Sequence, residues 1–270
     1  ENLNQIDKAI FHYQKSLKND KKLVEAYRNL ALIFEQINQK DDAREVYEVA
    51  IKNNPENFSI RNNFGRFLNS EKNYKQAVIH LTKAFKINPN SSKLNFNLAL
   101  SYKGIKNFEK AVEHYNKTLE LNPKYYQSYN HLSSIYYDQN LYFEAVNYVK
   151  KAIEFNPEYV EGLNNYGVML RDLGFIEKSE ILLKKAVNLN PNYHTAIWNL
   201  AITKLSQENY KEGWLGFNSR WLNPNLNQNQ NIFCNKPIWN GSEIGNLLIW
   251  SEQGIGDQIM FSIFFKFLTN

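Results

Sequence analysis

The sequence predicts an all-α solenoid of about six 34-residue helix–turn–helix repeats, followed by the strand–loop–helix start of a truncated α/β domain. Two observations predict the solenoid: a proline that recurs every 34 residues, and small residues at fixed offsets from it. The prolines are Pro55, Pro89, Pro123, Pro157 and Pro191. A fixed period of this length is typical of arrays in which each helix pair buries its apolar face by stacking on the next.

Small residues recur on both predicted helices of each unit, where a close helix contact requires them. On the first helix they are Ala31, Gly65, Ala99, Ser133, Gly167 and Ala201. On the second helix they include Ala43, Ala77, Ala111, Ala145 and Ser179. Proline then ends the second helix, because it lacks an N–H group and clashes with the preceding turn.

The repeats divide the chain into four parts. Residues 1–20 are expected to form the second helix of an incomplete repeat, and residues 24–223 to form six repeats. A polar linker at 224–240 and the first βα unit of another domain at 241–270 follow. Because the chain starts in mid-repeat without a Met, we expect it to be a fragment of a longer protein.

This pattern of small residues and prolines resembles the tetratricopeptide repeat, in five consecutive units that stay in register. The resemblance implies a right-handed superhelical solenoid whose concave surface is lined by the first helix of each unit. Repeat proteins of this kind bind other proteins or peptides, so a protein-binding scaffold is the expected function.

One position on the first helix carries asparagine in five of six repeats, and we call these six residues the ladder. They are Asn29, Asn63, Asn97, His131, Asn165 and Asn199. A carboxamide can both donate and accept a hydrogen bond, so it can hold a peptide backbone whatever the side chain. The ladder resembles the asparagine ladder in the repeat domain of O-linked N-acetylglucosamine transferases, which implies binding of an extended peptide. The alternative is that these asparagines serve only solubility and packing.

Other positions on the same face vary, and two of them are aromatic. Phe96 and Trp198 immediately precede ladder residues and are expected to hold apolar side chains of a ligand. Three histidines, His12, His80 and His114, occupy equivalent positions one or more repeats apart. Since that separation is too large for one metal ion, no metal site is predicted.

Composition and charge exclude several function classes. The net charge of +5 is mild for 270 residues, and lysine and glutamate are mixed, so nucleic-acid binding is not expected. No apolar run is long enough to span a bilayer. The single Cys234 cannot form an internal disulfide, so we expect a reducing, cytoplasmic location. The sequence leaves open whether the chain forms a homodimer.

The composition changes in the last thirty residues, where glycines gather around a short apolar segment. Residues 246–252 (NLLIWSE) suit a buried strand, residues 253–257 (QGIGD) a loop, and residues 258–268 a helix. Gly254 and Gly256 would let the backbone approach a phosphate or sugar at the start of that helix.

This C-terminal segment resembles bacterial repeat proteins that continue into a glycosyltransferase domain similar to the heptosyltransferases. The matching residues are Arg220, Trp221, Trp239, Gly241, Glu252, Gln253, Gly254, Gly256 and Asp257. The resemblance implies a nucleotide-sugar donor in the full-length protein and a catalytic base at Asp257. From the residues alone, Asp257 is equally suited to cap the helix that follows it.

Two hypotheses follow. In the first, the chain is the substrate-recognition region of a glycosyltransferase and presents a protein acceptor along the ladder. In the second, it is a non-catalytic adaptor that joins partner proteins. One strand and one helix cannot form a sheet, so neither catalysis nor a bound cofactor is expected from these 270 residues themselves.

Overall fold

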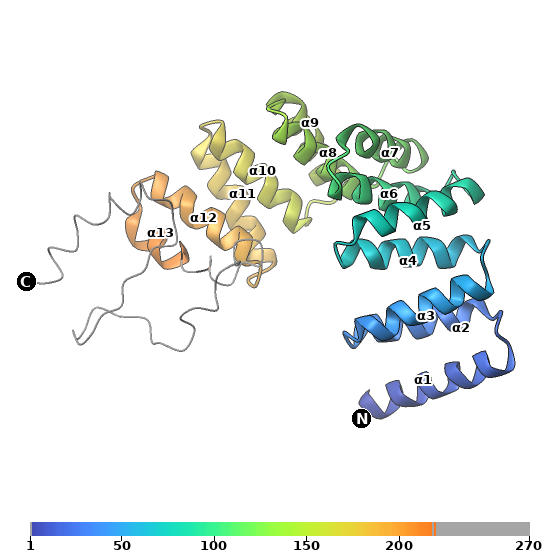
Figure 1. The fold of residues 1–270 in the computed structure, drawn as a ribbon. Helices are drawn as coiled ribbons and strands as arrows, with labels where there is room; N and C mark the ends of the chain where they lie inside the picture. The colour runs from blue at the N-terminus through green and yellow to red at the C-terminus, as the bar shows by residue number, and fades with distance from the viewer. Residues whose placement is uncertain (1, 218, 220–270) are drawn as a thin grey trace, which may run out of the picture. The chain divides into compact units, whose positions relative to one another are not determined.

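The computed structural model describes residues 2–217 and 219, and the elements that it assigns among them are all α-helices (Figure 1). They are α1 (Asn2–Asn19), α2 (Val24–Gln36), α3 (Lys40–Asn53), α4 (Phe58–Ser70), α5 (Tyr74–Ile87), α6 (Ser92–Gly104), α7 (Phe108–Leu121), α8 (Tyr126–Asp138), α9 (Tyr142–Phe155), α10 (Val160–Asp172), α11 (Ile176–Leu189), α12 (His194–Ser206) and α13 (Tyr210–Phe217). All belong to one compact unit, residues 1–223. The predicted all-α solenoid is confirmed for this part of the chain. The predicted strand at 246–252, the glycine loop and the helix at 258–268 lie outside the described residues.

The prolines end the second helices for a local reason. Each of these helices closes on the asparagine that precedes a proline: Asn54, Asn88, Asn122, Asn156 and Asn190. These asparagines have φ between −136° and −146°, outside the helical range. A residue before proline is sterically kept from the helical conformation, so the helix stops there and the next first helix begins a few residues later.

The turn from first to second helix also repeats. In every repeat one residue of this turn has φ between +58° and +83°: Asn38, Lys72, Lys106, Asn140, Gly174 and Glu208. This left-handed conformation reverses the chain within a single residue. Only one of the six is glycine, so five side chains tolerate a conformation that costs energy for an L-residue.

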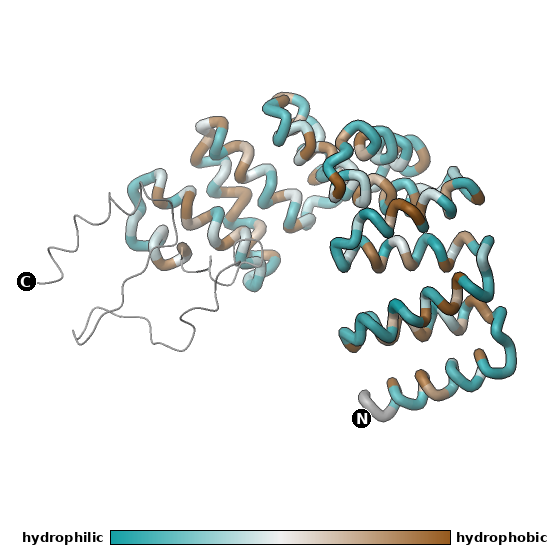
Figure 2. Tube along the Cα trace, viewed as in Figure 1, coloured by the Kyte–Doolittle hydropathy of each residue, from teal (hydrophilic) through white to brown (hydrophobic). Residues whose placement is uncertain are grey.

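Small residues are buried between the two helices of a repeat, as the sequence predicts. Ala43, Ala77, Ala111 and Ala145 are fully buried, and hydrophobic residues are interspersed with hydrophilic ones along the helices (Figure 2). One close approach is between α4 and α5, where a Cβ added to Gly65 would lie 2.3 Å from Cγ of Leu81. Leu81 is itself fully buried, so glycine is required at this contact.

First and second helices play different parts in the array. Each second helix packs against the first helix of its own repeat and against that of the next repeat. First helices also contact one another directly: α2 with α4, α4 with α6, α8 with α10, and α10 with α12. Side chains link α6 to α8, where Lys103 donates to Ser134 and the Phe96 ring lies 5.6 Å from that of His131. They therefore form a continuous layer, and we call its outward side the first-helix face.

Candidate functional site

The structure places the six ladder residues at one position on the first-helix face. Each is the sixth residue of its helix, on α2, α4, α6, α8, α10 and α12. They differ in how much of each remains exposed. Asn97 is only 8% exposed and Asn199 only 5%, whereas the other four are partly exposed. A ligand therefore reaches some ladder residues more easily than others.

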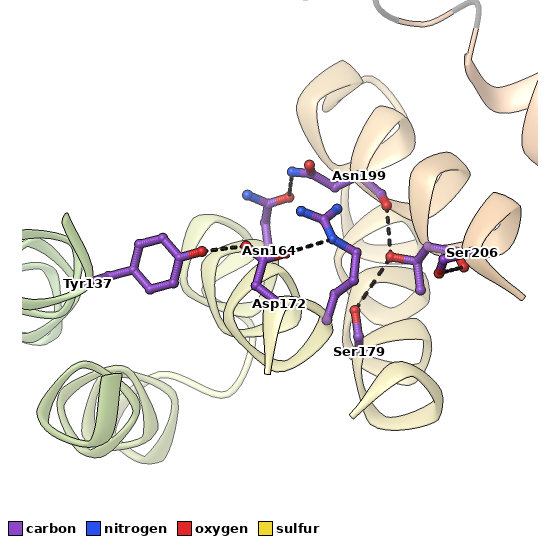
Figure 3. Close-up of polar contacts among 8 residues, drawn as sticks. Tyr137, Asn164, Asp172, Ser179, Asn199 and Ser206 are labelled. Atoms are coloured by element: carbon purple, nitrogen blue, oxygen red, sulfur yellow. Dashed lines mark hydrogen bonds and ion pairs between the residues drawn. The ribbon is translucent and has the colours of Figure 1, made fainter. Parts of the chain in front are cut away.

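Three ladder asparagines donate a hydrogen bond to the preceding first helix. The donor is Nδ2, and the acceptor is Oδ1 of the asparagine 35 residues earlier. The pairs are Asn97 with Asn62 at 3.1 Å, Asn165 with Asn130 at 3.0 Å, and Asn199 with Asn164 at 2.8 Å. Figure 3 shows the last pair between α10 and α12. The acceptors lie immediately before ladder residues, at the position that holds Phe96 and Trp198 in other repeats. The sequence analysis identified that position but not these bonds; the 35-residue spacing between the asparagines is the signal that could have found them.

A second line of polar contacts joins the same helices nearer their C-terminal ends. Its members, 34 residues apart, are Glu35, Asn69, Lys103 and Tyr137. Each bonds to the next first helix: Glu35 accepts from Arg66 at 2.7 Å, Asn69 donates to the Asn97 carbonyl at 2.8 Å, Lys103 donates to Ser134, and Tyr137 donates to Asp172. Four successive junctions, from α2–α4 to α8–α10, therefore each have a polar link at this level.

The middle of the ladder is aromatic. The His131 ring stacks on Tyr115 with centroids 5.4 Å apart and lies 5.6 Å from the ring of Phe96. Burial, with a smaller effect of the Lys103 ammonium, lowers the pKa of His131 to about 3, so the imidazole is neutral at physiological pH. Phe96 packs against Tyr125 at 4.8 Å and is partly buried in this cluster. Phe96 and His131 therefore help to hold α6 and α8 together.

The first two ladder residues, Asn29 and Asn63, do not make the carboxamide-to-carboxamide hydrogen bond that joins neighbouring repeats elsewhere. Asn29 donates to the Tyr13 hydroxyl at 3.2 Å. The Asn63 side chain is partly exposed and has no hydrogen-bond partner among residues 2–217 and 219, so its donor and acceptor both remain available. At the other end, Trp198 is partly exposed, but its Nε1 is buried without a partner in the described structure.

The predicted catalytic residue Asp257 and the predicted loop residues Gly254 and Gly256 lie outside the described residues. Within residues 2–217 and 219, no group of three His, Cys, Asp or Glu side chains could hold a metal ion. No helix in that range is long and apolar enough to cross a bilayer.

Sequence models of the tetratricopeptide repeat match most of the described chain. One matches residues 2–58 and 29–92, and three others match residues 92–125, 127–156 and 160–193. Comparison of the sequence with curated proteins gave no match.

Solved structures show the same architecture. A chain of the APC/C hetero-tetramer Cut9–Hcn1 superposes with a TM-score of 0.71 and 14% identity, over 80% of this chain and 43% of that one. PilW, described as a widely conserved type IV pilus biogenesis factor, superposes with a TM-score of 0.62 and 20% identity, over 70% of this chain and 88% of its own. MamA superposes with a TM-score of 0.52 and 26% identity, over 58% of this chain and 91% of its own. Because the identities to the Cut9–Hcn1 chain and to PilW are only 14% and 20%, the likeness to these two proteins shows a shared fold alone.

Proposed function

Because the chain belongs to the tetratricopeptide repeat family, we propose that this scaffold binds an extended polypeptide segment along its first-helix face. The observation that carries the proposal is the line of five carboxamides, interrupted by His131, at one position of six first helices. Asn63 is the member whose donor and acceptor are both available to a ligand. A single carboxamide can satisfy one N–H and one C=O of a peptide backbone.

The spacing of the helices suits an extended chain. Packed helices lie roughly 8–10 Å apart, and an extended peptide advances about 3.3 Å per residue. Successive ladder positions therefore meet the peptide at about every third residue. The bond from Asn165 to Asn130 holds the Asn165 carboxamide in a fixed orientation, which reduces the entropy lost on binding.

The contacts also limit which ladder residues take part. Asn97 and Asn199 are buried and donate to neighbouring repeats, so their first role is to hold the array together. We assign direct ligand contact to Asn29, Asn63 and Asn165, which are partly exposed. Backbone recognition by so few carboxamides gives weak binding that tolerates many peptide sequences.

The direct test compares one ladder residue with a matched asparagine elsewhere. Asn63→Ala should weaken the binding of two unrelated unstructured peptides by a similar factor of about 2–10, since a lost hydrogen bond costs about 0.5–1.5 kcal/mol. Asn116→Ala, at a partly exposed asparagine on the second helix α7, should leave both affinities unchanged. Unchanged affinity for Asn63→Ala in fluorescence anisotropy would refute backbone recognition at this position.

We further propose that the peptide is presented to a glycosyltransferase domain, with Asp257 as the base that activates the acceptor hydroxyl. The support is the C-terminal sequence segment with Glu252, Gln253 and Gly254 before Gly256 and Asp257. The full-length product of the source gene should then transfer sugar from a nucleotide-sugar to a protein acceptor. Asp257→Asn should abolish transfer, and Asn63→Ala should lower transfer to protein while leaving nucleotide-sugar hydrolysis intact. Absence of transfer in the full-length protein would leave the adaptor role.

A further inference from the structure

A cavity of about 390 Å³ lies away from the ladder, where the second helices α3 and α5 meet α4. Its apolar wall is made by Ile51, Phe64 and Leu68. Its polar lining comes from Arg44, Glu48, Asn73, Gln76 and His80. The volume falls within the range of small-ligand pockets in proteins.

The next two repeats show what fills the equivalent space. The positions of Ile51 and Leu68 are taken one repeat later by Phe85 and Tyr102. There the Tyr102 ring stacks on His114, the counterpart of His80, with centroids 5.5 Å apart and planes 7° from parallel. One repeat further, Tyr136 stacks on Tyr148 in the same relation, at 5.2 Å and 7°. The smaller Leu68 supplies no ring, and the aromatic contact that His80 does make is edge-on, with Phe64 at a centroid distance of 4.7 Å. Among the described residues the ring face of His80 that corresponds to the Tyr102 stack therefore has no stacked aromatic partner.

His80 also lacks the hydrogen bond that its counterpart makes. His114 Nδ1 lies 2.9 Å from Oδ1 of Asn95, whereas Arg61 stands at the equivalent position beside His80. Arg61 donates its Nε–H to the Pro55 carbonyl at 2.7 Å. His80 Nδ1 is left buried without a partner in the described structure. Burial, with the nearby charges of Arg61 and Lys83, lowers the pKa of His80 to about 4, so a neutral ring lines the cavity.

We propose that this cavity is a binding site for an aromatic side chain of a partner polypeptide, which stacks on His80 as Tyr102 stacks on His114. The partner ring packs on Ile51, the partly exposed member of the apolar wall, since Leu68 and Phe64 are themselves buried. Arg44 at the rim, whose Cζ lies 5.8 Å from the Phe67 ring, adds a cation that favours the face of an aromatic group. A tyrosine suits the site best, because its hydroxyl adds a hydrogen-bonding group. The site is separate from the ladder and does not depend on the proposed function.

The test uses N-acetyl-tyrosinamide as the probe and N-acetyl-leucinamide as its apolar control, followed through the His80 side-chain resonances in NMR titrations of the whole chain. The tyrosine probe should shift the His80 resonances saturably, and the leucine probe at least tenfold more weakly. Leu68→Tyr should fill the cavity from within and reduce probe affinity at least tenfold. Equal responses to the two probes, or unchanged affinity of Leu68→Tyr, would overturn the proposal.

A reciprocal variant keeps the proposal testable if Leu68→Tyr does not fold. Tyr102→Leu removes the ring that covers His114 and should open a second site of the same kind. The tyrosine probe should then shift the resonances of both His80 and His114, and the stoichiometry should rise from one to two. A folded Tyr102→Leu variant in which neither histidine responds would also refute aromatic recognition at these junctions.

Discussion

Asn199 on α12 donates a 2.8 Å hydrogen bond from Nδ2 to Oδ1 of Asn164 on α10, and both residues are buried (Figure 3). The same relation joins Asn165 to Asn130 and Asn97 to Asn62. The ladder position therefore has two environments: in part of the array its carboxamide holds adjacent repeats together, whereas the Asn63 carboxamide has no hydrogen-bond partner in the described part of the chain, and there we propose that it binds a ligand. Asn97 and Asn199 belong to the first group and Asn63 to the second, while Asn165 both bonds to Asn130 and stays partly exposed.

The first prediction concerns the buried pair. Asn164→Ala should lower the free energy of unfolding by about 1–3 kcal/mol, because the buried Nδ2 of Asn199 then loses its acceptor. The control is Asn192→Ala, at an exposed asparagine in the loop before α12. It should change the free energy of unfolding by less than about 0.5 kcal/mol. Urea denaturation measures both. Equal effects of the two substitutions would show that the carboxamide pair contributes nothing to stability.

The second prediction concerns pH. In the folded chain the pKa of His131 is lowered from 6.5 to about 3, chiefly by burial. The unfolded chain therefore takes up the proton first, and folding stability should fall as the pH drops below about 6.5 toward 3. His131→Asn should make the unfolding free energy less dependent on pH in this window. An identical pH dependence in wild type and variant, from urea denaturation at pH 7, 6, 5 and 4, would contradict this.

The third prediction concerns the turns. Lys72 has φ +58°, a conformation that glycine adopts without the strain of a Cβ. Lys72→Gly should therefore raise the unfolding free energy by about 0.5–1 kcal/mol. The matched control is Lys83→Gly in the interior of α5, which should lower it by about 1 kcal/mol. A loss of stability in both variants would mean that Lys72 makes a compensating contact.

The repeat architecture could be predicted from the sequence because local rules and long-range packing agree. Proline fixes where each second helix ends, and the small residues Ala43, Ala77 and Ala111 fix which sides pack closely. Both signals depend on residue type and period alone. The left-handed turn residues were harder to predict, since only Gly174 of the six is a glycine.

The site could be predicted only in part. The ladder positions follow from the period, but the sequence does not say which carboxamides bond to each other. That depends on the residue one place earlier in the previous repeat, which is asparagine at 62, 130 and 164. Phe96 was expected to hold apolar side chains of a ligand, which stays a prediction, but the sequence did not show that its ring also packs among Tyr115, Tyr125 and His131. That packing depends on side chains of α6, α7 and α8 lying close together in the folded chain, which the sequence alone does not show.

The most direct test of the central claim is an NMR titration of the asparagine side-chain amides with an extended peptide that contains no aromatic residue. Such a peptide leaves the cavity beside His80 empty, so the two proposed sites are separated. The account predicts that the Asn63 side-chain amide shifts first, with Asn29 and Asn165, while Asn116 on α7 stays unchanged. Shifts confined to second-helix residues, or none at all, would contradict peptide binding along the first-helix face.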